Sequence, residues 1–376
     1  MAATLKDPAS ALGTLEHVRA IAPYQAGKPI DELAREYGLD PSRIVKLASN
    51  ENPLGVPDSA KKAMAAAVED LGRYPDANGF ELKAALAARY GVPMDWITLG
   101  NGSNDILELA AAATLTPGRS CIYAQHSFAV YALATQARGA RAIIVPAYKL
   151  GHDLDAMLTA IAPDTALIYV ANPNNPTGTH LKAEAIDRFL ARVPPRVVVV
   201  LDEAYNEYLP PELRVDSTAW VRRYPNVIVS RTFSKAFGLA GLRVGYGLAQ
   251  QELTDLMNRV RQPFNVNTVA QAAAVAALAD DAFLARSYEL NLCGMQQLTA
   301  AFEALGLEYV PSVGNFVLVK VGPAARVYQE LLKRGVIVRP VANYGLPEWL
   351  RITVGLPEEN DVFLRALPEA LAAARG

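Results

Sequence analysis

The sequence is poor in the residues that build disulfide frameworks and metal sites. It contains two cysteines, Cys121 and Cys293, and four histidines in 376 residues. The cysteines lie far apart and lack the short spacing of metal ligands, so neither a disulfide framework nor a zinc motif is expected. The histidines are scattered along the chain, which argues against a histidine-based metal site. This composition predicts a chain of the reducing cytoplasm without a metal site.

Long hydrophobic runs and an excess of charge of one sign are also missing. No apolar run reaches the roughly 20 residues needed to span a bilayer, and no basic region followed by an apolar one opens the sequence. Lys and Arg number 36 against 38 Asp and Glu, which gives a net charge of −2. Such a balance offers no basic field for nucleic acid. We therefore expect no secretion signal, no membrane association and no nucleic-acid partner.

The chain does contain an alternation of short apolar segments with helical patterns, from Trp96 to Gly247. Seven of the apolar segments are predicted to be strands, at residues 96–99, 120–123, 142–145, 166–170, 197–201, 227–230 and 244–248. Helical patterns lie between several of them, at 104–114, 128–137 and 182–191. Buried strands that alternate with crossover helices predict an α/β fold with a mostly parallel sheet covered on both faces. Ligand sites in such a sheet lie at the carboxyl ends of the strands.

A different pattern follows the predicted sheet. Residues 268–305 are predicted to form one long helical region, and a smaller α/β unit comes after it. Its predicted elements are strands at 316–320, 336–339 and 350–354, a helix at 324–334 and a C-terminal helix from 358. The residues before about position 57 are rich in Pro, Gly and Asn and are predicted to be extended. A chain of 376 residues is long enough for two domains.

The segment 231–243 (RTFSKAFGLAGLR) sets a single lysine among small and hydroxylated residues. Burial of Lys235 there would lower its pKa and free its amine to attack a carbonyl. The hydroxyls of Thr232 and Ser234 and the guanidinium of Arg243 can hold a phosphate beside it. An imine-forming lysine next to a phosphate grip is what a pyridoxal phosphate (PLP) site requires. The alternative is an exposed lysine in a glycine-rich turn.

Two predicted strands end in polar residues. Asn175 lies in the turn 172–178 (NPNNPTG), and Asp202 follows the strand at 197–201. An Asn amide in that place can bind a phenolic oxygen, and Tyr205 can join it. A carboxylate at a buried strand end is costly unless it faces a cation, and a protonated pyridine nitrogen is such a cation. The alternatives are an ordinary Asn-Pro loop and an Asp that caps a helix.

A glycine-rich turn at residues 99–108 (LGNGSNDILE) leads from a predicted strand into a helix. Free backbone N–H groups and the helix dipole attract phosphate at such a start, and Ser103 and Asn104 are placed there. Phe128 follows the next strand, where a flat aromatic side chain can stack on a heteroaromatic ring. A plain capped helix start and a core phenylalanine are the alternatives.

Arg351 and Arg339 stand within apolar segments that are predicted strands. Arginine is rarely buried without an anionic partner. Its forked guanidinium binds a carboxylate or a phosphate through two hydrogen bonds. Both residues are therefore candidates for substrate binding, with an internal salt bridge as the alternative for each.

In their order along the chain, these elements resemble the fold-type I PLP-dependent enzymes of the aspartate aminotransferase superfamily. The shared order begins with a glycine-rich turn, an aromatic residue after the next strand and Asn-Pro-Thr-Gly. It continues with Asp-x-x-Tyr, Thr-x-x-Lys, an Arg eight positions after that Lys and an Arg near the C-terminus. The resemblance therefore covers essentially the whole chain. Within the superfamily, the segments most similar to the histidinol-phosphate aminotransferase family are 22–25 (APYQ), 47–55 (LASNENPLG), 73–76 (RYPD), 232–245, 314–316 (GNF) and 350–355 (LRITVG).

The resemblance implies a large PLP-binding domain over residues 60–265, built on a mostly parallel seven-stranded sheet covered by helices. A smaller α/β domain over 29–59 and 266–376 and an N-terminal arm over 1–28 are implied with it. The resemblance further implies amino transfer from L-histidinol phosphate to 2-oxoglutarate, which gives imidazole acetol phosphate and L-glutamate in histidine biosynthesis. A cytoplasmic homodimer that binds small-molecule substrates is expected.

The resemblance also implies a role for each matching residue. Lys235 is the lysine that forms the imine with the cofactor, Asp202 pairs with the pyridine nitrogen, and Asn175 and Tyr205 bind the ring hydroxyl. Phe128 stacks on the ring, at a position where the family commonly has Tyr. The cofactor phosphate is bound by Ser103, Asn104, Thr232, Ser234 and Arg243, and by Tyr74 of the neighbouring subunit. The substrate is bound by Tyr24, Asn315, Arg339 and Arg351.

Three other functions share parts of this pattern. An aromatic or broad-range amino acid aminotransferase uses the same scaffold, and Arg351 and Arg339 serve a carboxylate as well as a phosphate. Threonine-phosphate decarboxylase is similar overall and also grips a phosphate. A DNA-binding regulator built on an aminotransferase-like body is disfavoured, because the chain shows no basic patch.

Overall fold

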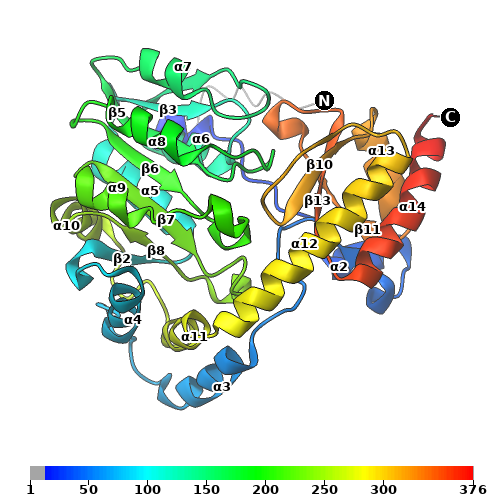
Figure 1. Ribbon diagram of the computed structural model, residues 1–376, viewed down its shortest axis with the longest axis horizontal. Helices are drawn as coiled ribbons and strands as arrows, with labels where there is room; N and C mark the ends of the chain where they lie inside the picture. The colour runs from blue at the N-terminus through cyan, green and yellow to red at the C-terminus, as the bar shows by residue number, and fades with distance from the viewer. Residues whose placement is uncertain (1–12, 376) are drawn as a thin grey trace.

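A seven-stranded sheet forms the larger part of the computed structural model, which describes residues 13–375 (Figure 1). Its strand order is β2-β8-β7-β6-β5-β3-β4. The strands are β2 (Ile97–Gly100), β3 (Ser120–Ala124), β4 (Arg141–Val145), β5 (Thr165–Ala171), β6 (Val198–Asp202), β7 (Val227–Thr232) and β8 (Gly245–Leu248). All neighbours run parallel except β8, which is antiparallel to both β2 and β7. The predicted α/β fold with a mostly parallel seven-stranded sheet is confirmed.

The central strands are buried on both faces. Every residue of β5 and of β7 is buried, whereas the edge strand β4 is largely exposed. Helices on each side of a parallel sheet remove both faces from water, so its central strands are near-continuous runs of Val, Ile and Leu rather than alternating ones. This double burial explains why the strands were recognisable as short apolar segments.

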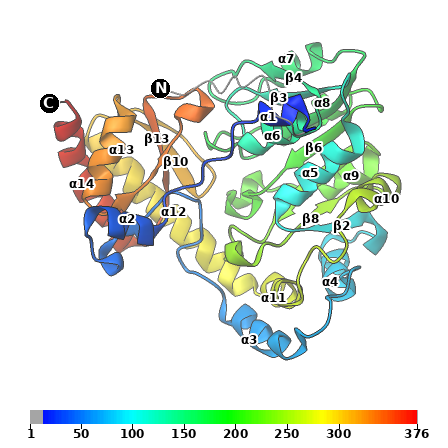
Figure 2. The same cartoon turned by 180° about the vertical axis from the view of Figure 1, so that it is seen from behind.

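Helices cover the two faces of the sheet, as the opposite views in Figures 1 and 2 show. On one face, the apolar core includes residues of α4 (Phe80–Tyr90), α7 (Leu154–Thr159), α8 (Ala183–Leu190), α9 (Thr218–Arg223) and α11 (Thr268–Leu278). On the other face, it includes residues of α5 (Ser103–Thr114), α6 (Ala129–Ala137) and α10 (Gln251–Val260). Helix α3 (Asp58–Ala67) packs against α11.

The smaller part of the molecule holds two further sheets. A four-stranded antiparallel sheet has the order β12-β13-β10-β9, and β1 pairs with β11 in a parallel ladder. The strands are β1 (Val45–Lys46), β9 (Tyr309–Val310), β10 (Phe316–Lys320), β11 (Val336–Ile337), β12 (Arg339–Pro340) and β13 (Trp349–Thr353). Helices α12 (Asp281–Ala304), α13 (Ala324–Lys333) and α14 (Pro357–Arg375) enclose a common core with β10 and β13. Helix α12 extends from the large sheet to this smaller part (Figure 1).

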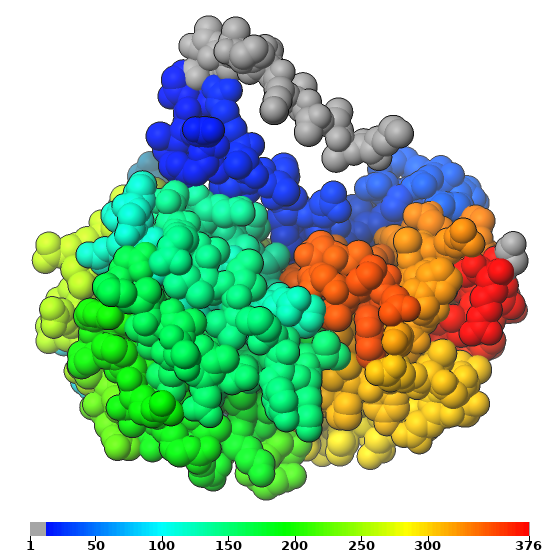
Figure 3. All heavy atoms as spheres, turned by 90° about the horizontal axis from the view of Figure 1, so that it is seen from above, coloured from blue at the N-terminus to red at the C-terminus, as the bar shows by residue number. Residues whose placement is uncertain are grey.

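The N-terminal segment contains helices where an extended chain was predicted. Helix α1 (Glu16–Arg19) packs against α6, and α2 (Ile30–Tyr37) lies beside α13 in the smaller part. In α2, apolar residues recur at Ile30, Leu33, Ala34 and Tyr37, so one face of the helix packs against the small domain core. Pro and Gly residues on either side of α2 favour an extended chain, so the helical spacing of its apolar residues was not recognised in the sequence. Figure 3 shows the blue segment between the two helices on the surface, where the two parts of the molecule meet.

Two predicted elements are each divided in the structure. The predicted helical region 268–305 is two helices, α11 and α12, bent by 79° at a short break. Asp280 lies at this break, and its side chain accepts a hydrogen bond from the backbone N–H of Phe283, which caps the new helix. The predicted strand 336–339 is also divided, because β11 pairs with β1 while β12 pairs with β13.

Within residues 13–375, no single helix is long and apolar enough to cross a membrane, although the bent pair α11 and α12 meets that criterion together. The same residues contain no group of three or more His, Cys, Asp or Glu side chains arranged to hold a metal ion. The division into an arm (1–28), a small domain (29–59 with 266–376) and a large domain (60–265) stays a proposal. Residues 1–12 of the arm lie outside the described residues.

Candidate active site

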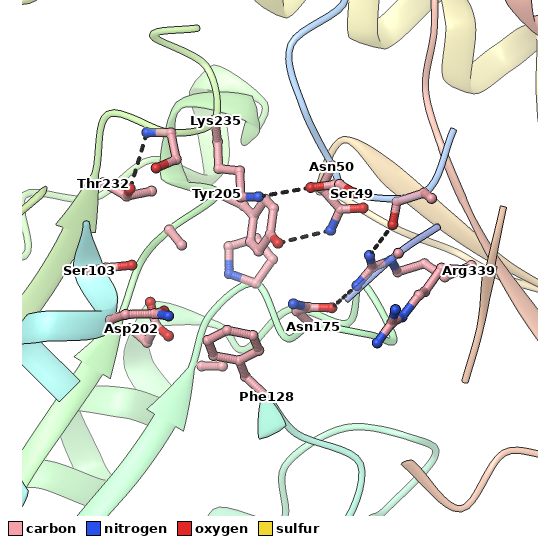
Figure 4. Close-up of a pocket in the computed structure, with 18 of the residues that line it drawn as sticks. Ser49, Asn50, Ser103, Phe128, Asn175, Asp202, Tyr205, Thr232, Lys235 and Arg339 are labelled. Carbon is pink, nitrogen blue, oxygen red and sulfur yellow. Dashed lines mark hydrogen bonds between the residues drawn. The ribbon is translucent and has the colours of Figure 1, made fainter. Parts of the chain in front are cut away.

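A cavity of about 210 Å³ lies where the carboxyl ends of the large sheet's strands meet the smaller part of the molecule (Figure 4). The segments that follow β2, β3, β5, β6 and β7 each contribute residues to it, and so do β12, β13 and residues 48–50. Thirteen of the fifteen predicted site residues line this cavity: Tyr24, Ser103, Asn104, Phe128, Asn175, Asp202, Tyr205, Thr232, Ser234, Lys235, Arg243, Arg339 and Arg351.

Lys235 follows β7 and points into the cavity. Its Nζ donates a hydrogen bond of 3.1 Å to the backbone carbonyl oxygen of Ser49 and lies 5.7 Å from the ring centre of Tyr205. Burial lowers the pKa of Lys235 to about 8, and the positive charge of Arg351 acts in the same direction. A large fraction of Lys235 is therefore neutral slightly above neutral pH, which gives the amine its nucleophilic and basic form.

Asp202 ends β6 and is only 6% exposed. Its Oδ2 accepts a hydrogen bond of 2.7 Å from the hydroxyl of Tyr131, whereas Oδ1 is buried and accepts none from the described residues. Burial raises the pKa of Asp202 to about 6, against the opposing effect of the Tyr131 hydrogen bond. A buried carboxylate oxygen without a donor, at the wall of a cavity, is suited to receive a hydrogen bond from a cationic ligand group.

Tyr205 and Asn175 face the cavity from the loops after β6 and β5. The hydroxyl of Tyr205 accepts a hydrogen bond of 2.9 Å from Nδ2 of Asn50, and burial raises the pKa of Tyr205 to about 12. Oδ1 of Asn175 accepts a 2.6 Å hydrogen bond from Nη1 of Arg351. The Tyr205 hydroxyl stays protonated at neutral pH, so it can donate to a ligand oxygen, as can the amide nitrogen of Asn175.

The hydroxylated residues predicted to bind phosphate gather around one guanidinium group. Nη1 of Arg243 donates hydrogen bonds to Oγ of Ser234 at 3.3 Å and to the carbonyl oxygen of Ala240 at 2.9 Å. Oγ1 of Thr232 accepts a hydrogen bond of 3.1 Å from the backbone N–H of Ser234. Hydroxyl groups and a cation held together in this way suit a phosphate dianion.

The start of α5 lies against the same arginine. Backbone N–H groups in the first turn of a helix lack partners within the helix, and Ser103 opens α5 at the cavity wall. Gly102, with a φ of +78°, precedes it, and a Cβ added there would lie 2.8 Å from Nη2 of Arg243. A Cβ on Gly245 would lie 2.5 Å from the backbone nitrogen of Ser103. The backbone before α5 therefore approaches the guanidinium closely because Gly102 lacks a side chain, and it approaches β8 closely because Gly245 lacks one.

The end of the cavity at Arg339 is also lined by Tyr24 and Tyr344. Nη2 of Arg339 donates a 2.6 Å hydrogen bond to the carbonyl oxygen of Gln25, and its guanidinium lies 5.7 Å from the ring centre of Tyr24. Phe128 presents its ring to the cavity and meets Tyr131 edge to face, with ring centres 6.0 Å apart. The end at Arg339 therefore combines a cation with the aromatic rings of Tyr24 and Tyr344.

Two predicted site residues lie outside the cavity lining. Asn315 is buried behind it, where Nδ2 donates to the carbonyl oxygen of Asn50 at 3.0 Å. Tyr74 is 81% exposed, and its ring stacks on Phe264 with 4.7 Å between ring centres. Asn315 thus holds a cavity residue in place, and Tyr74 presents an aromatic surface to the exterior.

Several residues of the cavity lining were not predicted from the sequence, and two of them, Tyr131 and Asn50, hold predicted site residues in place. Tyr131 lies three positions after Phe128, and Asn50 lies in the segment 47–55 that the family resemblance had already marked. Asn50 adopts a φ of 54°, which is uncommon for a residue other than glycine. Its backbone nitrogen and Oδ1 both bond Oγ1 of Thr353, so the side chain is fixed for its contact with Tyr205. The identity of the residue is the one local signal for this conformation, because Asn adopts a positive φ more often than most residues do.

The fold and the cavity define a fold-type I PLP-dependent transferase, with the site at the carboxyl edge of a mostly parallel seven-stranded sheet. The sequence matches the family "Aminotransferase class I and II" over residues 42–367. The chain belongs to this family.

Relatives of known name are similar over nearly the whole chain. A protein of Ralstonia nicotianae named histidinol-phosphate aminotransferase 2 is 71% identical over 96% of this chain and 97% of its own length. A protein of Cupriavidus pinatubonensis named histidinol-phosphate aminotransferase 1 is 69% identical over 95% and 96%. Among solved structures, the histidinol-phosphate aminotransferase of Sinorhizobium meliloti in complex with pyridoxal-5'-phosphate matches with a TM-score of 0.90 and 28% identity, over 97% of this chain and 99% of that one.

Proposed function

We propose that this chain transfers the amino group of L-histidinol phosphate to 2-oxoglutarate with pyridoxal 5'-phosphate as cofactor, giving imidazole acetol phosphate and L-glutamate. The observation that carries this proposal is the cavity itself. The partly buried Lys235 amine, the unsatisfied Oδ1 of Asp202 and the Arg243 cluster lie around one space. The names of relatives up to 71% identical support the choice of substrate.

The residues present fit pyridoxal 5'-phosphate group by group. The cluster of Ser103, Ser234 and Arg243 suits its phosphate, and Oδ1 of Asp202 lacks the donor that a protonated ring nitrogen would supply. Tyr205 and Asn175 suit the ring hydroxyl. When bound, this cofactor supplies an aldehyde that takes up the amino group and a ring that accepts electrons from the substrate α-carbon.

The protein's own groups orient the substrate and move its protons. Burial lowers the pKa of Lys235 to about 8. Its Nζ can therefore take a proton from the substrate α-carbon as a general base and later donate that proton to the product as a general acid. Asp202 stabilises positive charge next to its free oxygen. The two buried arginines that line the cavity, Arg351 and Arg339, bind the anionic end of each substrate.

The charge of the cavity fits the two substrates. Its lining contains four cationic side chains, Lys235, Arg243, Arg339 and Arg351, and one carboxylate, Asp202. One anion is the cofactor phosphate, so at least one guanidinium remains for a substrate phosphate or carboxylate. Because a guanidinium pairs with either anion, the same arginine can serve the phosphate monoester in one half-reaction and the dicarboxylate in the other.

We further propose that the chain works as a cytoplasmic homodimer in which Tyr74 reaches the cofactor phosphate of the neighbouring subunit. The 81% exposure of Tyr74 and its stacking on Phe264, away from its own cavity, support a contact with another copy. Sedimentation should give twice the mass of one chain. A mixture of Lys235→Ala and Tyr74→Ala chains should regain activity that neither has alone, since one site of the hybrid keeps both residues.

Activity assays on the purified enzyme distinguish this function from the alternative activities. Turnover with histidinol phosphate should exceed turnover with phenylalanine when 2-oxoglutarate is the acceptor, and Lys235→Ala should abolish both. Borohydride reduction followed by peptide mapping should place the cofactor on position 235. Faster turnover of phenylalanine would instead indicate an aromatic aminotransferase, and carbon dioxide release from threonine phosphate without a keto acid would indicate the decarboxylase.

A further inference from the structure

The hydroxyl group of Tyr131 is fixed against one oxygen of Asp202. Tyr131 is fully buried on α6, and its ring stacks on that of Tyr169 with 4.5 Å between centres and an angle of 8° between planes. Phe128 meets the same ring edge to face. Because its ring is fully buried and packs against these two rings, the Tyr131 side chain has little rotational freedom, and its hydroxyl donates to Oδ2 of Asp202 at 2.7 Å.

This hydrogen bond makes the two oxygens of Asp202 different. Oδ2 has a donor, whereas Oδ1 is buried without one among the described residues, and the residue lines the cavity. A hydrogen bond to one oxygen fixes the rotation of the carboxylate about its χ2 torsion, which is otherwise broad. Oδ1 is therefore the oxygen left for a ligand.

We propose that Tyr131 is a positioning residue that fixes the Asp202 carboxylate, keeps it ionised and so directs Oδ1 to the ring nitrogen of the cofactor. The inference rests on the proposed function, because it assumes that pyridoxal 5'-phosphate binds in this cavity. It concerns a residue that neither the sequence motifs nor the cavity's cations had indicated.

The charges around Asp202 explain why a donor is needed there. The titratable groups that face it are Tyr131 on α6, Glu203 and Tyr205 after β6, and Lys235 after β7, while Tyr169 on β5 lies behind Tyr131. Burial and the Glu203 charge raise the pKa of Asp202, and Lys235 opposes them only while it is protonated. Since the pKa of Lys235 is itself about 8, the Tyr131 hydroxyl and the backbone N–H of Ala204 are the groups that still lower the pKa of Asp202 when Lys235 becomes neutral, and the Tyr131 hydrogen bond has the larger effect of the two.

The test compares cofactor affinity in two phenylalanine variants that each lose one buried hydroxyl. Full-length protein is freed of cofactor and titrated with pyridoxal 5'-phosphate, with fluorescence as the readout. Tyr131→Phe keeps the stacked ring and should bind about tenfold more weakly at pH 7, since a hydrogen bond to a charged group is lost. Tyr123→Phe is the control, because Tyr123 packs against Tyr131 with 6.5 Å between ring centres but lies outside the cavity lining. It should bind within about twofold of the unsubstituted chain.

The pH dependence of cofactor affinity gives a second readout, which would not differ between the two proteins if Tyr131 had only a structural role. Without the Tyr131 donor, the pKa of Asp202 rises further, so protonated carboxyl appears at a higher pH in Tyr131→Phe than in the unsubstituted protein. The ratio of the two dissociation constants should therefore widen as the pH is lowered from about 9 to about 6.5. A ratio near one at every pH would overturn the proposal.

A double-mutant cycle separates an effect through Asp202 from an effect through packing. In an Asp202→Asn background, the further change Tyr131→Phe should alter cofactor affinity by less than about twofold. A full tenfold loss in that background would show that Tyr131 acts through packing, and the proposal would be wrong. If the unsubstituted chain bound no pyridoxal 5'-phosphate, the proposed function itself would fail, which is a distinct outcome.

Discussion

Arg351 on β13 donates a hydrogen bond of 2.6 Å from Nη1 to Oδ1 of Asn175, in the loop that follows β5. This contact joins the four-stranded sheet to the seven-stranded sheet at the wall of the cavity. Nη2 of the same guanidinium donates to the carbonyl oxygen of Ala48 at 2.7 Å, while Nε is buried without a partner in residues 13–375. One arginine thus joins β13, the loop at Asn175 and the segment at Ala48, and its Nε–H remains without an acceptor.

Replacement of Arg351 by lysine should impair substrate binding. An ammonium group cannot reproduce the planar fork that reaches both Asn175 and Ala48, so an anionic substrate loses its paired donor. We expect kcat/KM to fall by roughly thirtyfold, equivalent to about 2 kcal/mol, for histidinol phosphate and for 2-oxoglutarate. Steady-state kinetics with Arg334→Lys as control provide the measurement, since Arg334 pairs with Glu330 on the surface. Unchanged kinetics for both substrates would contradict the assigned role.

Replacement of Gly102 by alanine should weaken the phosphate cluster. The residue has a φ of +78°, and an added Cβ would lie 2.8 Å from Nη2 of Arg243. We expect unfolding free energy to fall by about 1–3 kcal/mol and affinity for pyridoxal 5'-phosphate to fall with it. Gly241→Ala is the matched control, because an added Cβ there meets no atom within 4 Å. Equal urea midpoints and equal affinities for the two variants would refute this explanation.

The burial of Lys235 should appear in the pH dependence of stability. Its pKa is about 8 in the folded protein against an ordinary value of 10.5, so between these values the unfolded chain binds more protons. Stability due to this residue must therefore rise with pH over that interval. Relative to Lys235→Met, the cofactor-free protein should gain about 2 kcal/mol between pH 7.5 and pH 10. Urea unfolding of both proteins measures the difference, and parallel stability profiles would exclude a depressed lysine pKa.

The residues at strand ends could be predicted because each carries its own local signal. Asp202 follows a run of four valines and a leucine, and Asn175 stands in a Pro- and Asn-rich turn directly after another strand. Parallel strands bring their carboxyl ends to the same edge of the sheet, so residues far apart in sequence converge there. Lys235 could be placed at this edge for the same reason, because it comes shortly after a predicted strand. Asn175, Asp202 and Lys235 all line the cavity.

The contacts of Tyr131 and Asn50 could not be predicted in the same way. The Tyr131 hydroxyl reaches Asp202 only because α6 packs on the sheet with a particular rotation, which residue spacing alone does not determine. Asn50 contacts Tyr205 because its segment runs between β1 and the large sheet, with an uncommon backbone conformation set by Thr353. Both depend on tertiary packing rather than on a local pattern.

The contacts that enclose the cavity have a consequence for the synthesis of the chain. Lys235 and Ser49 are 186 positions apart, Arg351 and Asn175 are 176 apart, and Arg351 and Ala48 are 303 apart. A growing polypeptide completes every strand of the seven-stranded sheet when residue 248 has been added, but it still lacks β13. The ribosome must therefore add about a hundred further residues before the nascent protein can close its binding site, and earlier fragments carry the lysine without the arginine that faces it.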